Sequence, residues 1–174
     1  MPSGRTHDAL TVTTGILGIP VVAAFMIPGE TSLGILGTAL AGYLISGLAC
    51  SPDMDTESVV YYRWGFLRWL WFPYQFLIPH RSRLSHGLLL GPAIRLVYLG
   101  LIFWVWMALV AVSSETGALW WAVILEWDGS LYFLAGWVAS SMLHSIADIV
   151  VSAYKKSSKR KSATRRTNVW RGRN

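Results

Sequence analysis

Histidine and aspartate residues recur in this chain at spacings that suit metal binding. His144 and Asp148 are four residues apart, which places both side chains on one face of a helix. An imidazole nitrogen and a carboxylate oxygen are both common zinc ligands, and imidazole also binds iron. The full set of residues expected to bind metal is His7, Asp8, Asp53, Asp55, His80, His86, His144 and Asp148.

This set is larger than a single four-coordinate ion needs. We expect a divalent transition metal, zinc in the first place with iron or manganese as alternatives. The surplus of ligands suggests a second ion about 3.5–4 Å from the first. Asp55 is the candidate catalytic residue, as a bridging ligand or general base, because the turn after Pro52 can present two carboxylates in different directions.

Arg81 and Arg83 lie between two of these histidines and are candidates for substrate binding. A guanidinium fork suits bidentate contact with a phosphate group. Each polar group also has a purely structural interpretation. The two arginines would then anchor the chain at the membrane surface, and His144 with Asp148 would be a hydrogen-bonded pair that joins helices.

The composition indicates a membrane protein rather than a soluble enzyme. Of 174 residues, 53% are hydrophobic and 14% are charged, whereas a soluble domain carries about 25% charged residues. The net charge of +6 is uneven, because residues 155–174 hold nine of the fifteen Lys and Arg residues and no acid, which leaves −3 on residues 1–154. This distribution does not fit a nucleic-acid groove, so no nucleic-acid partner is expected. The single cysteine, Cys50, excludes an intramolecular disulfide and a Cys-based zinc finger.

Four apolar segments are long enough to cross a hydrocarbon layer of about 30 Å as helices. They are Ala9–Ile27, Ser32–Cys50, Gly87–Val112 (interrupted by Pro92 and Arg95) and Leu131–Tyr154. A cleaved signal peptide is the alternative for the first segment, which the second apolar segment disfavours by following at once. The aromatic stretch Phe66–Ile78 is broken by prolines and is expected to lie at the membrane interface.

The predicted fold is therefore an all-α membrane helical bundle of about four transmembrane helices plus an interfacial aromatic segment. Residues 1–154 form the transmembrane metal-site domain, and residues 155–174 form a basic, disordered cytoplasmic tail that is attracted to anionic lipid headgroups. The oligomeric state stays open.

The Lys and Arg residues orient this bundle. With four spans, fourteen of the fifteen lie on the side that carries both termini, and the remaining one, Arg95, is inside the third span. The loops on the other side contain acidic residues but no Lys or Arg. The positive-inside rule therefore places both termini in the cytoplasm. The same topology brings all eight candidate ligands towards the cytoplasmic face, where ionisable groups at membrane depth are usually functional.

Several motifs together resemble a family of uncharacterised metal-binding membrane proteins common in photosynthetic bacteria, and more distantly YdjM-like membrane-bound metal-dependent hydrolases. The motifs are Pro2-Ser-Gly-Arg-Thr-His7-Asp8, Ser51-Pro-Asp53-Met-Asp55, Tyr62-Arg-Trp-Gly65, His80-Arg-Ser-Arg-Leu-Ser-His86-Gly and His144-x-x-x-Asp148. The resemblance implies a metal site and a hydrolase activity in a bacterial inner or thylakoid membrane, but no substrate.

We therefore expect a metal-dependent hydrolase with a cytoplasm-facing site, acting on phosphoesters of a lipid or lipid-linked substrate. A non-catalytic metal-binding or transport protein is the first alternative. Ion transport would need a polar path across the bilayer, and the fourth span is apolar from Leu131 to Val138. A scaffold with a structural His/Asp cluster is the second alternative.

Overall fold

The computed structural model describes residues 4–25, 31–80, 82–113 and 129–171 of the chain. Side chains are described for residues 4–18, 33–80, 82, 84–110 and 129–160. Within these ranges the protein is all-α and contains no β-strand, which confirms the all-α part of the predicted fold.

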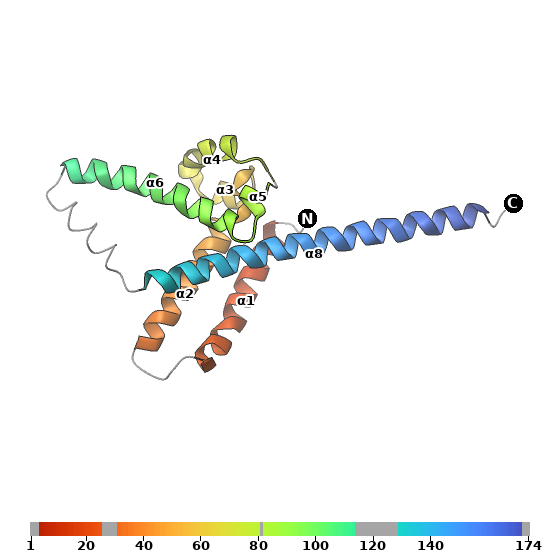
Figure 1. Cartoon of the computed structure of the whole chain (residues 1–174), viewed down its shortest axis with the longest axis horizontal. Helices are drawn as coiled ribbons and strands as arrows, with labels where there is room; N and C mark the ends of the chain where they lie inside the picture. The colour runs from red at the N-terminus through yellow and green to blue at the C-terminus, as the bar shows by residue number, and fades with distance from the viewer. Residues whose placement is uncertain (1–3, 26–30, 81, 114–128, 172–174) are drawn as a thin grey trace.

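Four long helices frame the molecule, and short helical elements connect the second to the third (Figure 1). The long helices are α1 (Gly4–Phe25), α2 (Thr31–Leu48), α6 (Leu90–Ser113) and α8 (Ser130–Arg171). The connecting elements are η1 (Pro52–Asp55), α3 (Val59–Arg63), η2 (Gly65–Trp71), α4 (Phe72–Leu77) and α5 (Arg83–His86). Each long helix overlaps one of the four predicted apolar segments over the described residues, and α8 extends well beyond its segment.

Proline and glycine residues explain why the connection is a series of short turns. Pro52 occupies the start of η1, and the preceding Ser51 is extended, as expected before a proline. Ser58 caps α3 by accepting a hydrogen bond from the Tyr61 amide. Gly65 has φ 54°, a left-handed conformation that ends α3 and that other residues rarely adopt.

The closest helix packing joins α2 and α8, and glycine residues permit it. A Cβ atom on Gly136 of α8 would lie 1.9 Å from the carbonyl oxygen of Ala39 in α2. A Cβ atom on Gly42 of α2 would lie 2.1 Å from the carbonyl oxygen of Phe133 in α8. The two backbones therefore approach closely through small residues, as is common between transmembrane helices.

The hydrophobic core lies where the end of α2 and the short helices meet α6 and α8. Its buried members are Cys50, Met54, Val60, Tyr61, Trp71, Tyr74 and Trp137. The Trp137 indole N–H donates to the Pro92 carbonyl at 3.2 Å, which connects α8 to the first turn of α6. This core lies beside η1, which packs against both α5 and α8.

Three of the described helical segments are long and apolar enough to cross a membrane: Leu33–Asp55, Leu90–Val110 and Ser130–Arg160. Large apolar side chains on these segments face outward, with Leu101 58% exposed and Trp104 57% exposed on α6. The first predicted span, 9–27, runs into residues whose side chains lie outside the described ranges. The count of four spans therefore stays a prediction.

Beyond Tyr154 the structure differs from the disordered tail that the sequence predicts, because α8 continues as one helix to Arg171 (Figure 1). Residues 155–171 contain no Gly or Pro, and Lys and Arg are good helix formers. The division of the chain into a membrane domain and a tail stays a prediction.

Candidate metal centre

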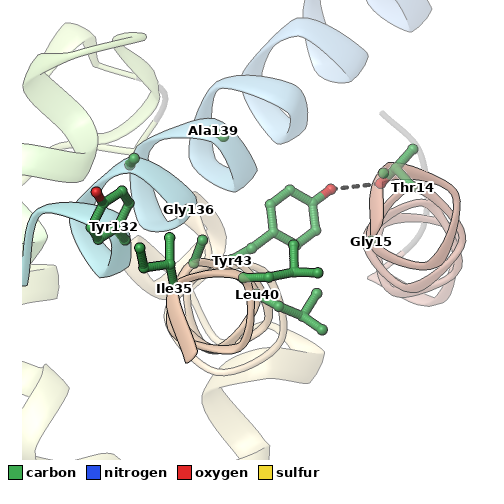
Figure 2. Close-up of a pocket in the computed structure, with 12 residues that line it drawn as sticks. Thr14, Gly15, Ile35, Leu40, Tyr43, Tyr132, Gly136 and Ala139 are labelled. Carbon is green, nitrogen blue, oxygen red and sulfur yellow. Dashed lines mark hydrogen bonds between the residues drawn. The ribbon is translucent and has the colours of Figure 1, made fainter. Parts of the chain in front are cut away.

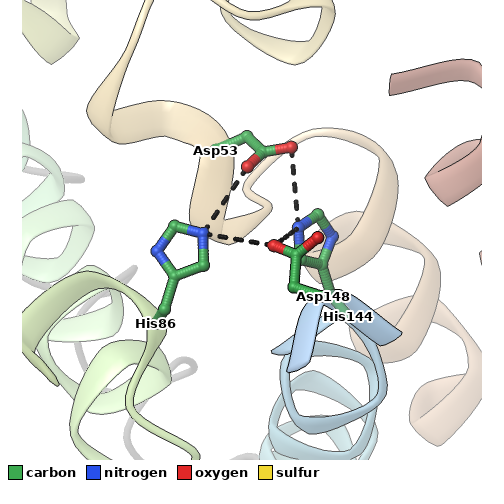
Figure 3. Close-up of side chains that lie close together, drawn as sticks. All are labelled: Asp53, His86, His144 and Asp148. Atoms are coloured by element: carbon green, nitrogen blue, oxygen red, sulfur yellow. Dashed lines mark ion pairs between the residues drawn. The ribbon is translucent and has the colours of Figure 1, made fainter. Parts of the chain in front are cut away.

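Four of the predicted metal-binding side chains converge on one point from three parts of the chain (Figure 3). Asp53 comes from η1, His86 from the end of α5, and His144 and Asp148 from successive turns of α8. One ligand atom from each of the four lies within 4.8 Å of the other three. No other group of three or more His, Cys, Asp or Glu side chains in the described part of the chain has this geometry.

The nitrogen–oxygen distances within this group are closer to the separation of two ligands on one metal ion than to the length of a hydrogen bond. Asp148 Oδ2 lies 3.5 Å from His86 Nε2 and 3.8 Å from His144 Nε2. Asp53 places one carboxylate oxygen 3.6 Å from His86 Nε2 and the other 3.5 Å from His144 Nε2. Hydrogen bonds between N–H and oxygen are about 2.7–3.2 Å long. Tetrahedral ligands at about 2.0–2.1 Å from zinc lie about 3.3–3.4 Å apart.

Three of the atoms at this point are buried and have no hydrogen-bond partner. They are His86 Nε2, His144 Nε2 and Asp148 Oδ2. A buried polar atom without a partner costs about 1–3 kcal/mol, so native proteins seldom leave three together. The residues present therefore fit a cation that would satisfy these atoms at once.

His7 contacts two members of the group from α1. Its Nε2 atom lies 3.1 Å from Asp148 Oδ1, the carboxylate oxygen that does not face His86. Its ring also stacks on the His144 ring, with the centroids 3.7 Å apart and the planes at 13°. His7 thus orients Asp148 and His144 from outside the group of four.

A second set of contacts orients His86 from its other ring nitrogen. His86 Nδ1 lies 2.9 Å from the Ser85 hydroxyl and 3.6 Å from Asp55 Oδ2. The other oxygen of Asp55 lies 2.9 Å from His80 Nδ1. A carboxylate or hydroxyl behind a ligating histidine is the usual arrangement at metal sites, because it fixes the ring and its tautomer. His80 and Asp55 therefore support the centre from a position further out.

The charge of His86 depends on these carboxylates. Burial by itself would lower the pKa of His86, but the nearby carboxylates of Asp148, Asp53 and Asp55 favour the charged ring and raise it to about 9, from 6.5. The metal-free protein therefore holds a proton on His86 at neutral pH. Since a metal binds only the neutral ring, that proton must leave when a metal binds.

The remaining predicted site residues lie elsewhere or outside the described ranges. Both carboxylate oxygens of Asp8 accept hydrogen bonds from Arg63 of α3, and the Arg63 guanidinium also donates to the Leu48 carbonyl at 2.9 Å. Asp8 therefore ties α1 to α3 beside the centre. Arg81 lies outside the described residues, and Arg83 begins α5 with a side chain outside them.

Local structure explains how the Asp-x-Asp motif divides its carboxylates. A 3-10 helix has three residues per turn, so side chains two residues apart point in different directions. In η1, Asp53 faces the two histidines of the converging group and Asp55 faces His80 and the back of His86. The expectation that this turn presents its carboxylates in different directions agrees with the geometry.

The sequence reasoning missed two supporting residues. Ser85 is fully buried and contacts His86, and Arg63 is the partner of Asp8. The position of Ser85 directly before a histidine was the available signal. No pattern in the sequence connects Arg63 with Asp8, since they are 55 residues apart.

An apolar pocket of about 460 Å³ lies between α1, α2 and α8 and shares no lining residue with the four converging side chains (Figure 2). A hydrogen bond of 2.5 Å between Thr14 and Tyr43 crosses it. Thr14 is seven residues beyond His7 in α1, which is about 10 Å along the helix. Between the two places Gly47 packs tightly against Thr11 and Ser140.

Comparisons with known proteins agree with the chemistry of the centre. Residues 2–158 match the family described as uncharacterized metal-binding protein (DUF2227). An uncharacterized protein of Aquifex aeolicus (strain VF5) is 31% identical over 128 residues, which are 66% of this chain and 90% of that protein. No solved structure matches the chain. Because the family match includes all four converging residues and nearly the whole chain, the protein belongs to this family of uncharacterized metal-binding proteins.

Proposed function

We propose that this protein binds one divalent transition-metal cation between Asp53, His86, His144 and Asp148. The observation that carries the proposal is the convergence of buried, unpartnered ligand atoms at separations of 3.5–3.8 Å. Two imidazole nitrogens and two carboxylates suit zinc, with iron or manganese as alternatives. The proposed ligand set is thus smaller than the eight residues expected from the sequence, and it needs one ion rather than two.

The proposed setting is a bacterial inner or thylakoid membrane, with both termini in the cytoplasm. Three apolar helical segments with outward-facing apolar side chains support the membrane location, because such surfaces are unfavourable in water. The position of the Lys and Arg residues supports the orientation. The partners we propose are membrane lipids, with anionic headgroups contacting the basic residues after Tyr154.

Metal analysis of the full-length protein purified in detergent tests the binding proposal. We expect one equivalent of a transition metal in the wild type and a loss of most of it in the His144→Ala variant. Ser145→Ala is the matched control, because Ser145 is a buried neighbour on α8 without a ligand atom in the group. Two equivalents would favour the dinuclear alternative. Absence of stoichiometric metal from the wild type would leave only the scaffold interpretation.

Metal-dependent hydrolysis of a phosphoester on a lipid or lipid-linked substrate is a second candidate function. The Asp55–His80 pair favours it, because Asp55 lies behind His86 while the His80 side chain is 40% exposed. This pair connects the centre to the surface and could carry a proton between them. Arg81 and Arg83 stay candidates for phosphate contact from their position in the sequence.

In this second candidate a bound divalent cation would act as a Lewis acid toward a phosphoryl oxygen. The oxygens of Asp55 face His86 and His80 rather than the converging ligand atoms, so Asp55 would accept the proton of the attacking water through one intervening water molecule and pass it to His80, whose exposed ring releases it. Asp55→Asn would retain a hydrogen-bonding side chain but not the base. Loss of a general base typically lowers the rate about 10²–10⁴-fold.

A panel of phospholipids and polyprenyl phosphates presented to the metal-loaded protein tests the hydrolase. Turnover by the wild type that falls at least 100-fold in Asp55→Asn, at unchanged metal content, would support it. If the metal-loaded wild type cleaves none of these compounds, the hydrolase candidate fails and the non-catalytic metal-binding function remains.

A further inference from the structure

Arg95 of α6 is a fully buried cation that the proposed ligand set does not use. The sequence places it inside the third predicted span. In the structure its exposed fraction is 0%. Its Nη1 atom donates to the Ser85 carbonyl oxygen at 3.1 Å, and its Nη2 atom donates to the Ser141 hydroxyl at 2.6 Å.

Both acceptors of Arg95 are next to proposed metal ligands. Ser85 directly precedes His86, and its own hydroxyl contacts the His86 ring at 2.9 Å. Ser141 lies one helical turn before His144 on α8. A displacement of either serine would therefore move one of the two imidazole nitrogens that face the centre.

A chain of hydroxyl groups extends these contacts to α2, which leads into Asp53. The Ser141 hydroxyl lies 3.0 Å from the Ser46 hydroxyl, and Ser46 donates to the Trp137 carbonyl oxygen at 2.8 Å. Arg95, Ser141 and Ser46 thus connect α6, α8 and α2 inside the helix packing. The elements joined directly or through this chain include α5 and α8, which supply three of the four converging side chains, and α2, which leads into the η1 turn that carries Asp53.

We propose that Arg95 is a positioning residue of the metal centre, which holds His86 and His144 in register through Ser85 and Ser141. This inference rests on the proposed metal binding. Only arginine offers two donors in a rigid fork that can meet a backbone carbonyl and a hydroxyl at once. A lysine would keep the charge, but its single ammonium cannot reproduce the two-point contact.

Charge gives Arg95 a second role in the same centre. A buried guanidinium costs several kcal/mol unless opposite charge lies nearby, and Asp55 is close enough to attract it. With neutral histidines, Asp53, Asp55 and Asp148 carry three negative charges against the one positive charge of Arg95. The excess of two negative charges is what a divalent cation neutralises.

Binding of Co²⁺ to the full-length protein in detergent tests this role, with the visible absorption of the bound ion as a report on ligand geometry. The variants are Arg95→Lys and Ser141→Ala. Arg68→Lys is the matched control, because Arg68 of η2 stacks over the rings of Tyr62 and Trp69 away from the centre. Loss of a supporting contact typically weakens metal binding about 10–100-fold.

We expect folded Arg95→Lys and Ser141→Ala proteins to bind Co²⁺ at least tenfold more weakly than the wild type, with an altered visible spectrum, and Arg68→Lys to match the wild type in both. Wild-type affinity and spectrum in both folded variants would overturn the positioning role while leaving metal binding intact. If Arg95→Lys fails to fold, Ser141→Ala decides the matter. If the wild type binds no Co²⁺, the metal-binding proposal fails and this inference falls with it.

Discussion

Asp53 and Asp148 both face the same two ring nitrogens, Nε2 of His86 and Nε2 of His144, and this shared geometry distinguishes them from the other described acids of the chain. Their oxygens lie 3.5–3.8 Å from the ring nitrogens of His86 and His144. Asp8 instead accepts hydrogen bonds from Arg63, and Asp55 contacts His80 and the opposite ring nitrogen of His86. At the scale of single residues, the ring nitrogens that each carboxylate faces thus separate proposed ligands from supporting groups of the same chemical type.

Asp8→Asn tests this separation, because Asp8 was one of the eight residues expected to bind metal. We predict that the variant keeps the metal content of the wild type and loses up to about 1 kcal/mol of stability, the usual value of a partly exposed ion pair. Metal analysis and thermal unfolding measure the two effects. Asp53→Asn provides the contrast and should lose most of its metal. A metal-free Asp8→Asn protein would return Asp8 to the ligand set.

The protonation of His86 predicts how metal binding depends on pH. Because its pKa of about 9 exceeds its ordinary value of 6.5, the proton stabilises the metal-free fold fully below pH 6.5, and this contribution disappears as the pH rises through 9. The proton competes with the metal, so apparent affinity for Zn²⁺ should rise about tenfold for each pH unit from 6.5 towards 9. Competition with a chelator across this range measures it, and a flat profile would contradict the protonated metal-free state.

At the scale of elements, the contact between α2 and α8 fixes the distance between Asp53 and the two ligands of α8. Gly42 and Gly136 let the backbones meet without intervening side chains. Asp53 follows α2 by only a few residues, so any separation of the two helices would move its carboxylate away from His144. The glycines therefore act on the centre through packing.

Gly136→Ala tests the importance of this contact. The new methyl group would lie 1.9 Å from the Ala39 carbonyl oxygen, so the helices must separate. Overpacking of this kind costs about 1–3 kcal/mol, and we expect a lower unfolding temperature and weaker metal binding. Gly100→Ala in α6 is the matched control, since nothing lies within 4 Å of its Cβ position. Equal unfolding temperatures for the two variants would contradict the close-packing interpretation.

At the scale of the whole molecule, the exposed apolar surface and the distribution of basic residues together support a membrane location and an orientation in it. The long helices expose apolar side chains over much of their length, while the basic residues collect at the end of α8. Figure 1 shows this end of α8 extending well beyond the other helices. This polarity is what the positive-inside rule uses to orient a membrane protein.

Reporter fusions test the proposed orientation. Alkaline phosphatase fused after Asn174 should be inactive, because this enzyme requires the oxidising periplasm for its disulfides. A fluorescent protein fused at the same position should be bright. Insertion of alkaline phosphatase after Glu115, in the acidic loop predicted on the opposite side, is the control and should be active. The reverse pattern would overturn the proposed topology.

Composition and periodicity were sufficient for the helical class and for the positions of the long helices. Apolar runs of about 20 residues produce helices through local hydrogen bonding, which does not depend on their neighbours. The i, i+4 relation of His144 and Asp148 is local in the same sense. The continuation of α8 to Arg171 was not predicted, because charge was read as disorder although Lys and Arg favour helix.

Only the tertiary structure decided which polar residues meet. It paired Asp8 with Arg63 and placed Asp55 behind His86, and it buried Arg95 between two serines. These relations depend on how closely α2 approaches α8 and on the direction in which each side chain of η1 points. Such distances arise from packing between segments far apart in the chain, whereas the sequence by itself determines only the residue types and the helices that carry them.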